Sequence, residues 1–172
     1  MRATGIVRRM DELGRVVIPK ELRRTMRIRE GEELEVFTTD DNSLVLKKYS
    51  AMEELADFRH DYASSVYGAT GYTAIITDND KVVAVSGDIK GVRIGDVVSD
   101  KLTAIYDGRR RVELSAEEDI FSGKAEYRSA VVAPIISGGD VMGGVILLSR
   151  KPSSELALKT ADTAAAFFAS RV

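Results

Sequence analysis

The stretch DELGRVVIPKELRRTMRI, residues 11–28, joins a short apolar run to a polar segment rich in basic residues. The β-branched run predicts a strand over residues 15–18. Pro19 suits the first turn of a helix, because its missing N–H has no intrahelical partner there. The stretch therefore predicts a strand followed at once by a helix over residues 19–28.

Four arginines surround this apolar run. Arg15 precedes it, and Arg23, Arg24 and Arg27 lie within the predicted helix. Residues four apart share a helix face, so we expect Arg23 and Arg27 to point the same way. A planar guanidinium can grip a phosphate or a guanine edge with two hydrogen bonds. The spacing therefore suggests an anionic partner.

The charge distribution supports this interpretation. The whole chain of 172 residues has a formal net charge of only −2. Residues 1–29 hold nine Lys or Arg against three Asp or Glu, a net charge of +6. Residues 30–48 and residues 49–172 each carry −4. Positive charge gathered in one short segment of an otherwise acidic chain is typical of a nucleic-acid-binding surface.

The first fifty residues spell a β-β-α-β-β pattern. Further strands are predicted over residues 3–9, 33–39 and 43–49, from β-branched content and from apolar residues at every second position. So short a segment has little apolar surface of its own. Two copies that share one core would supply the missing burial, and a two-fold dimer is the commonest arrangement.

The run GRVVIPKELRR, residues 14–24, closely resembles the AbrB family of bacterial transition-state regulators. The resemblance covers about residues 1–50 and implies a swapped-hairpin β-barrel, formed by a dimer, that binds double-stranded DNA through arginines. Arg8 and Arg9 are neighbours on a predicted strand and should face opposite sides, and the resemblance implies that Arg8 is the one that faces the DNA. The predicted DNA-binding residues are Arg8, Arg9, Arg15, Arg23, Arg24, Arg27, Lys47 and Lys48.

A helix is predicted to follow residue 50 and to connect the two halves over residues 51–71. The residues SAME at 50–53 match a capping box, in which the Glu53 side chain reaches back to Ser50. Gly68 and Gly71 are expected to end the helix. An apolar stripe follows the helix, and we expect it to pack on the C-terminal domain or on the same helix of a partner. The stripe comprises Met52, Leu55, Phe58, Tyr62 and Val66.

Residues 72–172 predict a mixed α/β domain. Strands are expected over 72–78, 81–86, 110–114, 127–136 and 140–149, and helices over 96–108 and after Pro152. The segment APIISGGDVMGGVILLS, residues 133–149, is similar to the paired central strands of GAF domains. The predicted fold is therefore α+β, with an AbrB-like domain over 1–50, a helical connector over 51–71 and a GAF-like domain with an antiparallel sheet over 72–172.

Several classes of site are disfavoured by composition. The chain has no cysteine and one histidine, His60, which excludes thiolate metal sites and leaves little for a zinc site or a His-based triad. SGGDVMGG at residues 137–144 lacks the lysine and the helix of a phosphate-binding loop and predicts a β-turn. Alternating carboxylates at residues 30–35 predict a solvated strand rather than a metal site. We expect no metal, no cofactor and no enzymatic activity, although the C-terminal domain has room for a small-molecule ligand.

Together these patterns predict a cytoplasmic transcription regulator, and the resemblance implies a role in sporulation and a tetramer built from two DNA-binding dimers. We expect a homodimer through the N-terminal domain and a homotetramer through the C-terminal domain, where the alanine-rich segment 163–169 is a candidate interface. The apolar stretch at residues 141–149 is far shorter than the ~20 residues that cross a bilayer, so no membrane partner is expected. The alternative is an antitoxin of a toxin–antitoxin pair, since the same β-fold occurs there.

Overall fold

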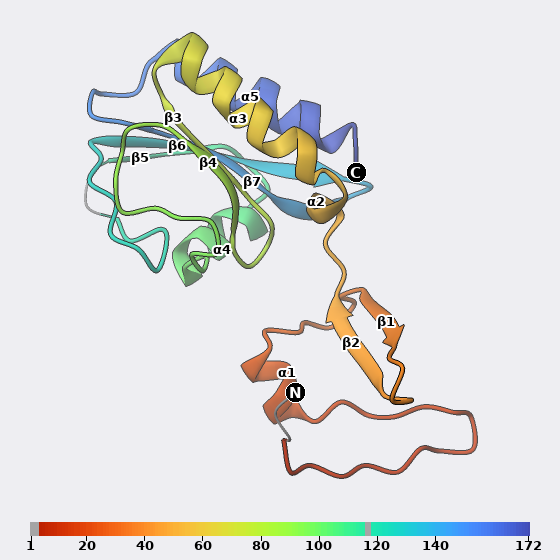
Figure 1. Cartoon of the computed structure of the whole chain (residues 1–172). Coiled ribbons are helices and arrows are strands. Elements are labelled where there is room, and N and C mark those ends of the chain that lie inside the picture. Colours follow the sequence, from red (N-terminus) through yellow and green to blue (C-terminus); the bar gives the residue numbers. More distant parts are fainter. Residues whose placement is uncertain (1–3, 116–117) are drawn as a thin grey trace. The chain divides into compact units, whose positions relative to one another are not determined.

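The computed structural model describes residues 4–115 and 118–172, and the chain divides into two compact units. The first unit comprises residues 1–49 and the second comprises residues 50–172. The chain passes from one to the other between Tyr49 and Ser50 (Figure 1).

The first unit is built around one antiparallel hairpin. Strand β1 (Leu34–Thr38) pairs with β2 (Leu44–Lys48), as the alternating apolar pattern predicted. The Asn42 backbone lies in the left-handed region, with φ of 59°, and its N–H donates to the Thr39 carbonyl. Asparagine tolerates this conformation, so the turn residues fix the register of the hairpin.

The two predicted N-terminal strands are absent: residues 4–18, all of them described, form no strand. Residue 3, where the first of these strands was expected to begin, lies outside the described residues. Val16 and Val17 are 51% and 69% exposed. A strand needs a ladder of backbone hydrogen bonds with a neighbour, and the backbone bonds of residues 4–18 are those of one turn, from the Asp11 N–H to the Arg15 carbonyl and from the Gly14 N–H to the Asp11 carbonyl, both at 3.0 Å. The prediction of strands at 3–9 and 15–18 is therefore wrong for the single chain.

The second unit begins with two helices, α2 (Ala51–Glu54) and α3 (Ala56–Thr70). Ser50 is the N-cap residue, but its hydroxyl makes no capping hydrogen bond, so the predicted capping box is wrong. Glu53 is engaged elsewhere, by Lys81 at 3.2 Å and Arg59 at 3.5 Å. Gly71, with φ of 72°, ends α3 as predicted, whereas Gly68 lies within the helix.

A five-stranded antiparallel sheet forms the centre of the second unit. Its order is β4-β3-β7-β6-β5, so the two longest strands, β6 and β7, lie toward the middle. The strands are β3 (Thr73–Thr77), β4 (Val82–Ser86), β5 (Val112–Ser115), β6 (Ser129–Ser137) and β7 (Asp140–Ser149). The predicted strands are confirmed: no end is shifted by more than two residues, and the bounds of β7 are as predicted.

One face of the sheet is covered by α3 and by α5 (Glu155–Ala169), which lie alongside each other (Figure 1). Met52, Ala63, Ala161 and Phe168 are buried in the core between these helices and the sheet. The apolar stripe of residues 51–71 therefore packs within its own unit, which corrects the expectation that it could pair with a partner helix. Phe58 is the exception, since it remains exposed and lies beside Arg171.

The other face of the sheet holds a second core, which lies under α4 (Asp100–Asp107) and under two loops, residues 87–99 and 118–128. Helix α4 begins four residues later than predicted, because the Ser99 hydroxyl caps it by accepting from the Leu102 N–H. Tyr106 is buried with its hydroxyl bonded to that of Thr77, and burial raises the pKa of the Tyr106 phenol. Phe121 from the second loop also lies in this core, so the chain's own side chains fill this face.

Among the residues that the structure describes, no helix has the length and apolar character needed to span a membrane.

Candidate nucleic-acid interface

The turn before the VVI run is held by Asp11. Its carboxylate accepts the backbone N–H of Leu13 at 3.0 Å and that of Arg15 at 2.8 Å. The other carboxylate oxygen pairs with the Arg15 Nε at 2.7 Å. The Arg15 N–H and then its guanidinium hold the pKa of Asp11 below the usual value. Arg15 nevertheless stays 70% exposed, so Asp11 orients a guanidinium that still faces solvent.

Arg8 and Arg9 lie on the extended segment that precedes this turn, and both are exposed. The Arg8 guanidinium donates to the Val7 carbonyl at 3.1 Å, a local contact that water can replace. Without a strand here, no pleat places the two side chains on opposite sides. Their orientation in one chain is therefore not set by a sheet.

Helix α1 (Lys20–Thr25) presents Arg23 and Arg24 to solvent. Pro19 is buried and is the N-cap residue, so it lies one position before the helix rather than within its first turn as predicted. The Arg23 guanidinium lies 3.3 Å from the Ile18 carbonyl, which draws it back over the end of the VVI run. The helix thus places two basic side chains beside the apolar segment.

The helix ends earlier than predicted, and Arg27 lies outside it. Arg27 has a left-handed backbone, with φ of 53°. Its N–H donates to the Arg24 carbonyl at 3.2 Å, and the Ile28 N–H donates to the Arg23 carbonyl at 2.8 Å. This pair of bonds is a Schellman cap, which usually has glycine at the left-handed position. The expectation that Arg23 and Arg27 share a helix face is therefore wrong.

The hairpin contributes two lysines with different surroundings. The Lys47 ammonium lies 4.5 Å from the centre of the Phe37 ring and remains at the surface. Lys48 is largely covered: its Nζ pairs with Glu32 at 2.7 Å and donates to the Arg27 carbonyl at 3.1 Å. Lys48 thus ties the hairpin to the residue that closes the helix.

The sequence did not single out Asp11 or Glu32, which position two of the predicted site residues. The spacing DELGR is the signal for the first, since an aspartate at the start of a turn commonly accepts nearby backbone N–H groups. Glu32 belongs to the acidic segment that was interpreted as a solvated strand. Among the described residues, no group of three or more His, Cys, Asp or Glu could hold a metal ion.

The first unit leaves its apolar side chains uncovered. Pro19 alone is buried among residues 4–49, all of which the structure describes. Val36 and Leu46 are register partners on the hairpin, and both are exposed. The other large exposed apolar residues of this unit are Ile6, Val7, Met10, Leu13, Val16, Val17, Met26, Leu44 and Tyr49.

The family described as "Stage V sporulation protein T C-terminal, transcription factor" matches residues 54–172. The family described as "Antidote-toxin recognition MazE, bacterial antitoxin" matches residues 7–54. The two matches meet close to the boundary between the structural units.

Two relatives from Bacillus subtilis (strain 168) show the same division. Stage V sporulation protein T is 43% identical over 98% of this chain and 97% of its own length. The transition state regulatory protein AbrB is 61% identical over 49 residues, which are 28% of this chain and half of AbrB. The resemblance of the N-terminal unit to AbrB is confirmed.

The second unit has the fold of a GAF domain. The GAF domain of an Acinetobacter phosphoenolpyruvate-protein phosphotransferase superposes with a TM-score of 0.54, over 73% of this chain and 83% of that domain. At 16% identity the match concerns the fold alone. With the full-length relative and the C-terminal match, these findings settle the classification. The chain belongs to the stage V sporulation protein T family of transcription factors.

Proposed function

We propose that the chain is a cytoplasmic, sporulation-type regulator that binds specific double-stranded DNA through arginines of a dimeric N-terminal unit. The observation that carries the proposal is the composition of that unit. Its described residues hold nine exposed basic side chains, close to a set of apolar residues that a single copy leaves exposed.

The uncovered apolar residues support a dimer with a shared core. Val36, Leu44 and Leu46 occupy one face of the hairpin and would need a second copy to leave water. Burial of apolar surface contributes ~25 cal/mol per Å², and one copy of this unit gains only part of it, since Pro19 alone among residues 4–49 is fully buried. Pairing would also supply strand partners for residues 3–9 and 15–18. The swapped-hairpin barrel is therefore our proposal for the assembled form.

In that form the arginines become a fixed array. Arg15 is oriented by Asp11, and Arg23 is drawn toward the Ile18 carbonyl. We assign phosphate or base contacts to Arg8, Arg9, Arg15, Arg23, Arg24, Arg27 and Lys47. Lys48 we assign to positioning, because its ammonium already serves Glu32 and the Arg27 carbonyl.

A salt titration tests DNA binding. Log affinity should fall linearly with log salt concentration, because bound arginines release counterions from the phosphates. Arg23→Ala should weaken binding and reduce the slope by about one for each copy of the contact that is lost. Arg93→Ala, which removes an exposed arginine of the second unit, is the matched control. Equal slopes for the two variants and the wild type would refute the proposal.

For the second unit we propose a role in joining two DNA-binding dimers into a tetramer, with small-molecule sensing as a further role. The alanine-rich segment 163–169 packs mainly on its own sheet, with Ala164, Ala165 and Phe168 buried, so it offers little surface to a partner. Phe58 of the adjacent helix α3 has an exposed aromatic side chain and is the better candidate for the interface. Sedimentation of Phe58→Asp against the wild type would test the assembly, with a shift from tetramer to dimer expected.

An antitoxin is the second candidate, favoured by the match of residues 7–54 to that family. Such proteins commonly use a disordered tail to wrap a toxin, whereas residues 50–172 form a sheet with a core on each face. Limited proteolysis separates the two functions. Rapid degradation of residues 51–172 would favour an antitoxin, and a stable fragment of that range is the expected result.

A further inference from the structure

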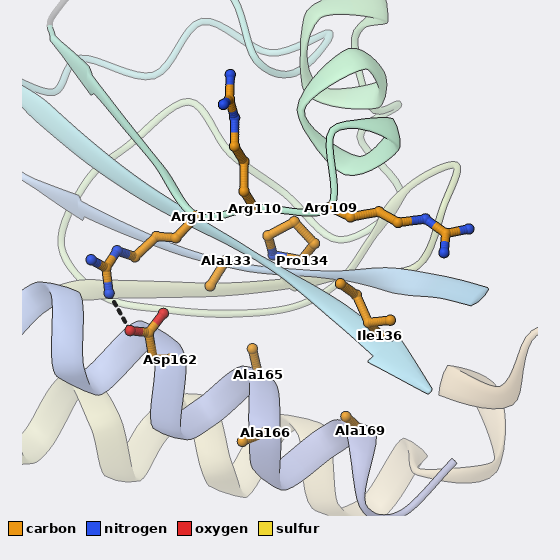
Figure 2. Close-up of a pocket in the computed structure, with 10 residues that line it drawn as sticks. All are labelled: Arg109, Arg110, Arg111, Ala133, Pro134, Ile136, Asp162, Ala165, Ala166 and Ala169. Atoms are coloured by element: carbon orange, nitrogen blue, oxygen red, sulfur yellow. Dashed lines mark hydrogen bonds and ion pairs between the residues drawn. The ribbon is translucent and has the colours of Figure 1, made fainter. Parts of the chain in front are cut away.

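A small hollow opens in the second unit between α5 and the outer part of β6 (Figure 2). Strand β5 pairs with β6 only from Ser129 to Val132, so the following residues of β6 have no strand on that side. The hollow has a volume of about 220 Å³. It lies on the side of the sheet that α3 and α5 cover, away from the core under α4.

The hollow combines an apolar floor with a basic rim. Ala133, Pro134 and Ile136 line it from β6, and alanines line it from α5. Three consecutive arginines, residues 109–111, form the rim just after α4 ends. Acidic residues outnumber basic ones by eighteen to fourteen in residues 50–172, so such a run is not a consequence of a basic composition. No sequence motif distinguishes these arginines.

One carboxylate already occupies the rim. Asp162 of α5 pairs with the Arg111 guanidinium, and the two side chains are 52% and 36% exposed. An exposed pair of this kind contributes little to stability, so an incoming anion can displace it. Figure 2 shows the guanidiniums of Arg109 and Arg110 directed away from the hollow and from each other. Both side chains are exposed and can turn toward a bound anion.

We propose that this hollow binds a small organic anion, a carboxylate with a short apolar chain. The apolar chain of the ligand lies against Pro134, Ile136 and Ala165. The ligand's carboxylate replaces that of Asp162 at the Arg111 guanidinium, and Arg110 provides a second positive charge. Its use as an effector site rests on the sensing role proposed above, but binding itself does not.

Other occupants fit less well. Inorganic phosphate would leave the apolar floor in water. A peptide added as a strand along β6 would meet Pro134, which has no backbone N–H to donate and is typical of a protected sheet edge. A carboxylate with an apolar chain satisfies both the floor and the rim.

The test is a titration of the full-length protein with hexanoate, followed by isothermal calorimetry, with hexan-1-ol and inorganic phosphate as parallel probes. Hexanoate should bind and the other two should not. Arg111→Gln should weaken hexanoate binding by about tenfold, because a charge-assisted pair is lost. Asp162→Asn should tighten it by about threefold, because the competing carboxylate is gone. Arg128→Gln, at another exposed arginine of this unit, should bind hexanoate as the wild type does.

Several outcomes would overturn the proposal. These are the absence of binding heat with hexanoate, binding of hexan-1-ol as tight as that of hexanoate, binding of phosphate alone, or hexanoate binding by Arg111→Gln that equals that of the wild type while its near-ultraviolet tyrosine spectrum is unchanged. DNA affinity, measured on the same samples without hexanoate, distinguishes a failure of the proposed hollow from a failure of the proposed DNA binding. If the salt slope still depends on Arg23, a failure of hexanoate binding concerns the hollow alone. If the Arg111 variant loses DNA affinity, the arginine run is a DNA contact and the hollow is not a ligand site.

Discussion

Leu44 in the first unit and Leu156 in the second are both largely exposed, at 67% and 55%, but their units are built differently. The second unit has a core on each face of its sheet, and Leu156 lies outside both. The first unit has no such core in its described residues, so Leu44 stays largely uncovered within its own unit. Exposure of the same size is therefore an ordinary surface position in the second unit, whereas in the first unit it would be an interface of the dimer that we propose.

The largest expected effect is that of an acidic substitution at Leu44, compared with the same substitution at Leu156. Leu44→Asp should lower DNA affinity by about 100-fold or more, since a carboxylate buried without a partner in a shared core costs several kcal/mol. Leu156→Asp should leave DNA affinity and thermal stability nearly unchanged. Sedimentation and DNA titration of both variants provide the measurement. Equal behaviour would mean that the first unit does not rely on a partner copy.

A second prediction compares the backbone of the two units at one glycine in each. Gly143 has a φ of 144°, and an added Cβ would lie 2.0 Å from the Thr77 carbonyl oxygen. Gly143→Ala should therefore destabilise the second unit by about 3 kcal/mol, from strain and overpacking together. Gly14 has a φ of 76° with open space around it, so Gly14→Ala should cost only about 1 kcal/mol.

Near-ultraviolet circular dichroism during urea unfolding can measure the loss in the second unit. Five of the six tyrosines, residues 62, 67, 72, 106 and 127, lie there. If Gly143→Ala lost its tyrosine signal at the same urea midpoint as the wild type, the close contact of residue 143 with Thr77 would be contradicted.

The smallest effect concerns Asp78, which is buried in the second unit and accepts the N–H groups of Asp80 and Lys81. Desolvation raises the pKa of Asp78 above 3.8. The folded state then binds the proton more tightly than the unfolded state, so stability declines as pH rises through the interval above 3.8. Asp78→Asn keeps the acceptor and removes the charge. It should give a small gain in stability at pH 7 that shrinks below pH 4, and a gain independent of pH would contradict this origin.

The sequence predicted the second unit well because its strands and helices bury faces that their own periodicity reveals. Ala161, Ala164 and Phe168 recur at helical spacing and are all buried on the sheet. It predicted the hairpin of the first unit for the same reason. It failed at Arg27, because a left-handed arginine that closes a Schellman cap looks in the sequence like one more helical residue. It also missed the hollow beside Arg111, whose lining comes from segments far apart in the chain.

By itself, the sequence determined the division into a basic N-terminal segment and an α/β C-terminal half, the positions of the C-terminal strands along the chain and the kinds of side chain available to an anion. These features follow from local pattern and charge, which do not depend on distant contacts. Only the tertiary structure decided which apolar residues find cover within one chain, which guanidiniums are held by Asp11, Asp162 or a carbonyl, and where the sheet edge stays open. Those outcomes depend on which surfaces meet, and burial is a property of the packed molecule rather than of any stretch of its chain.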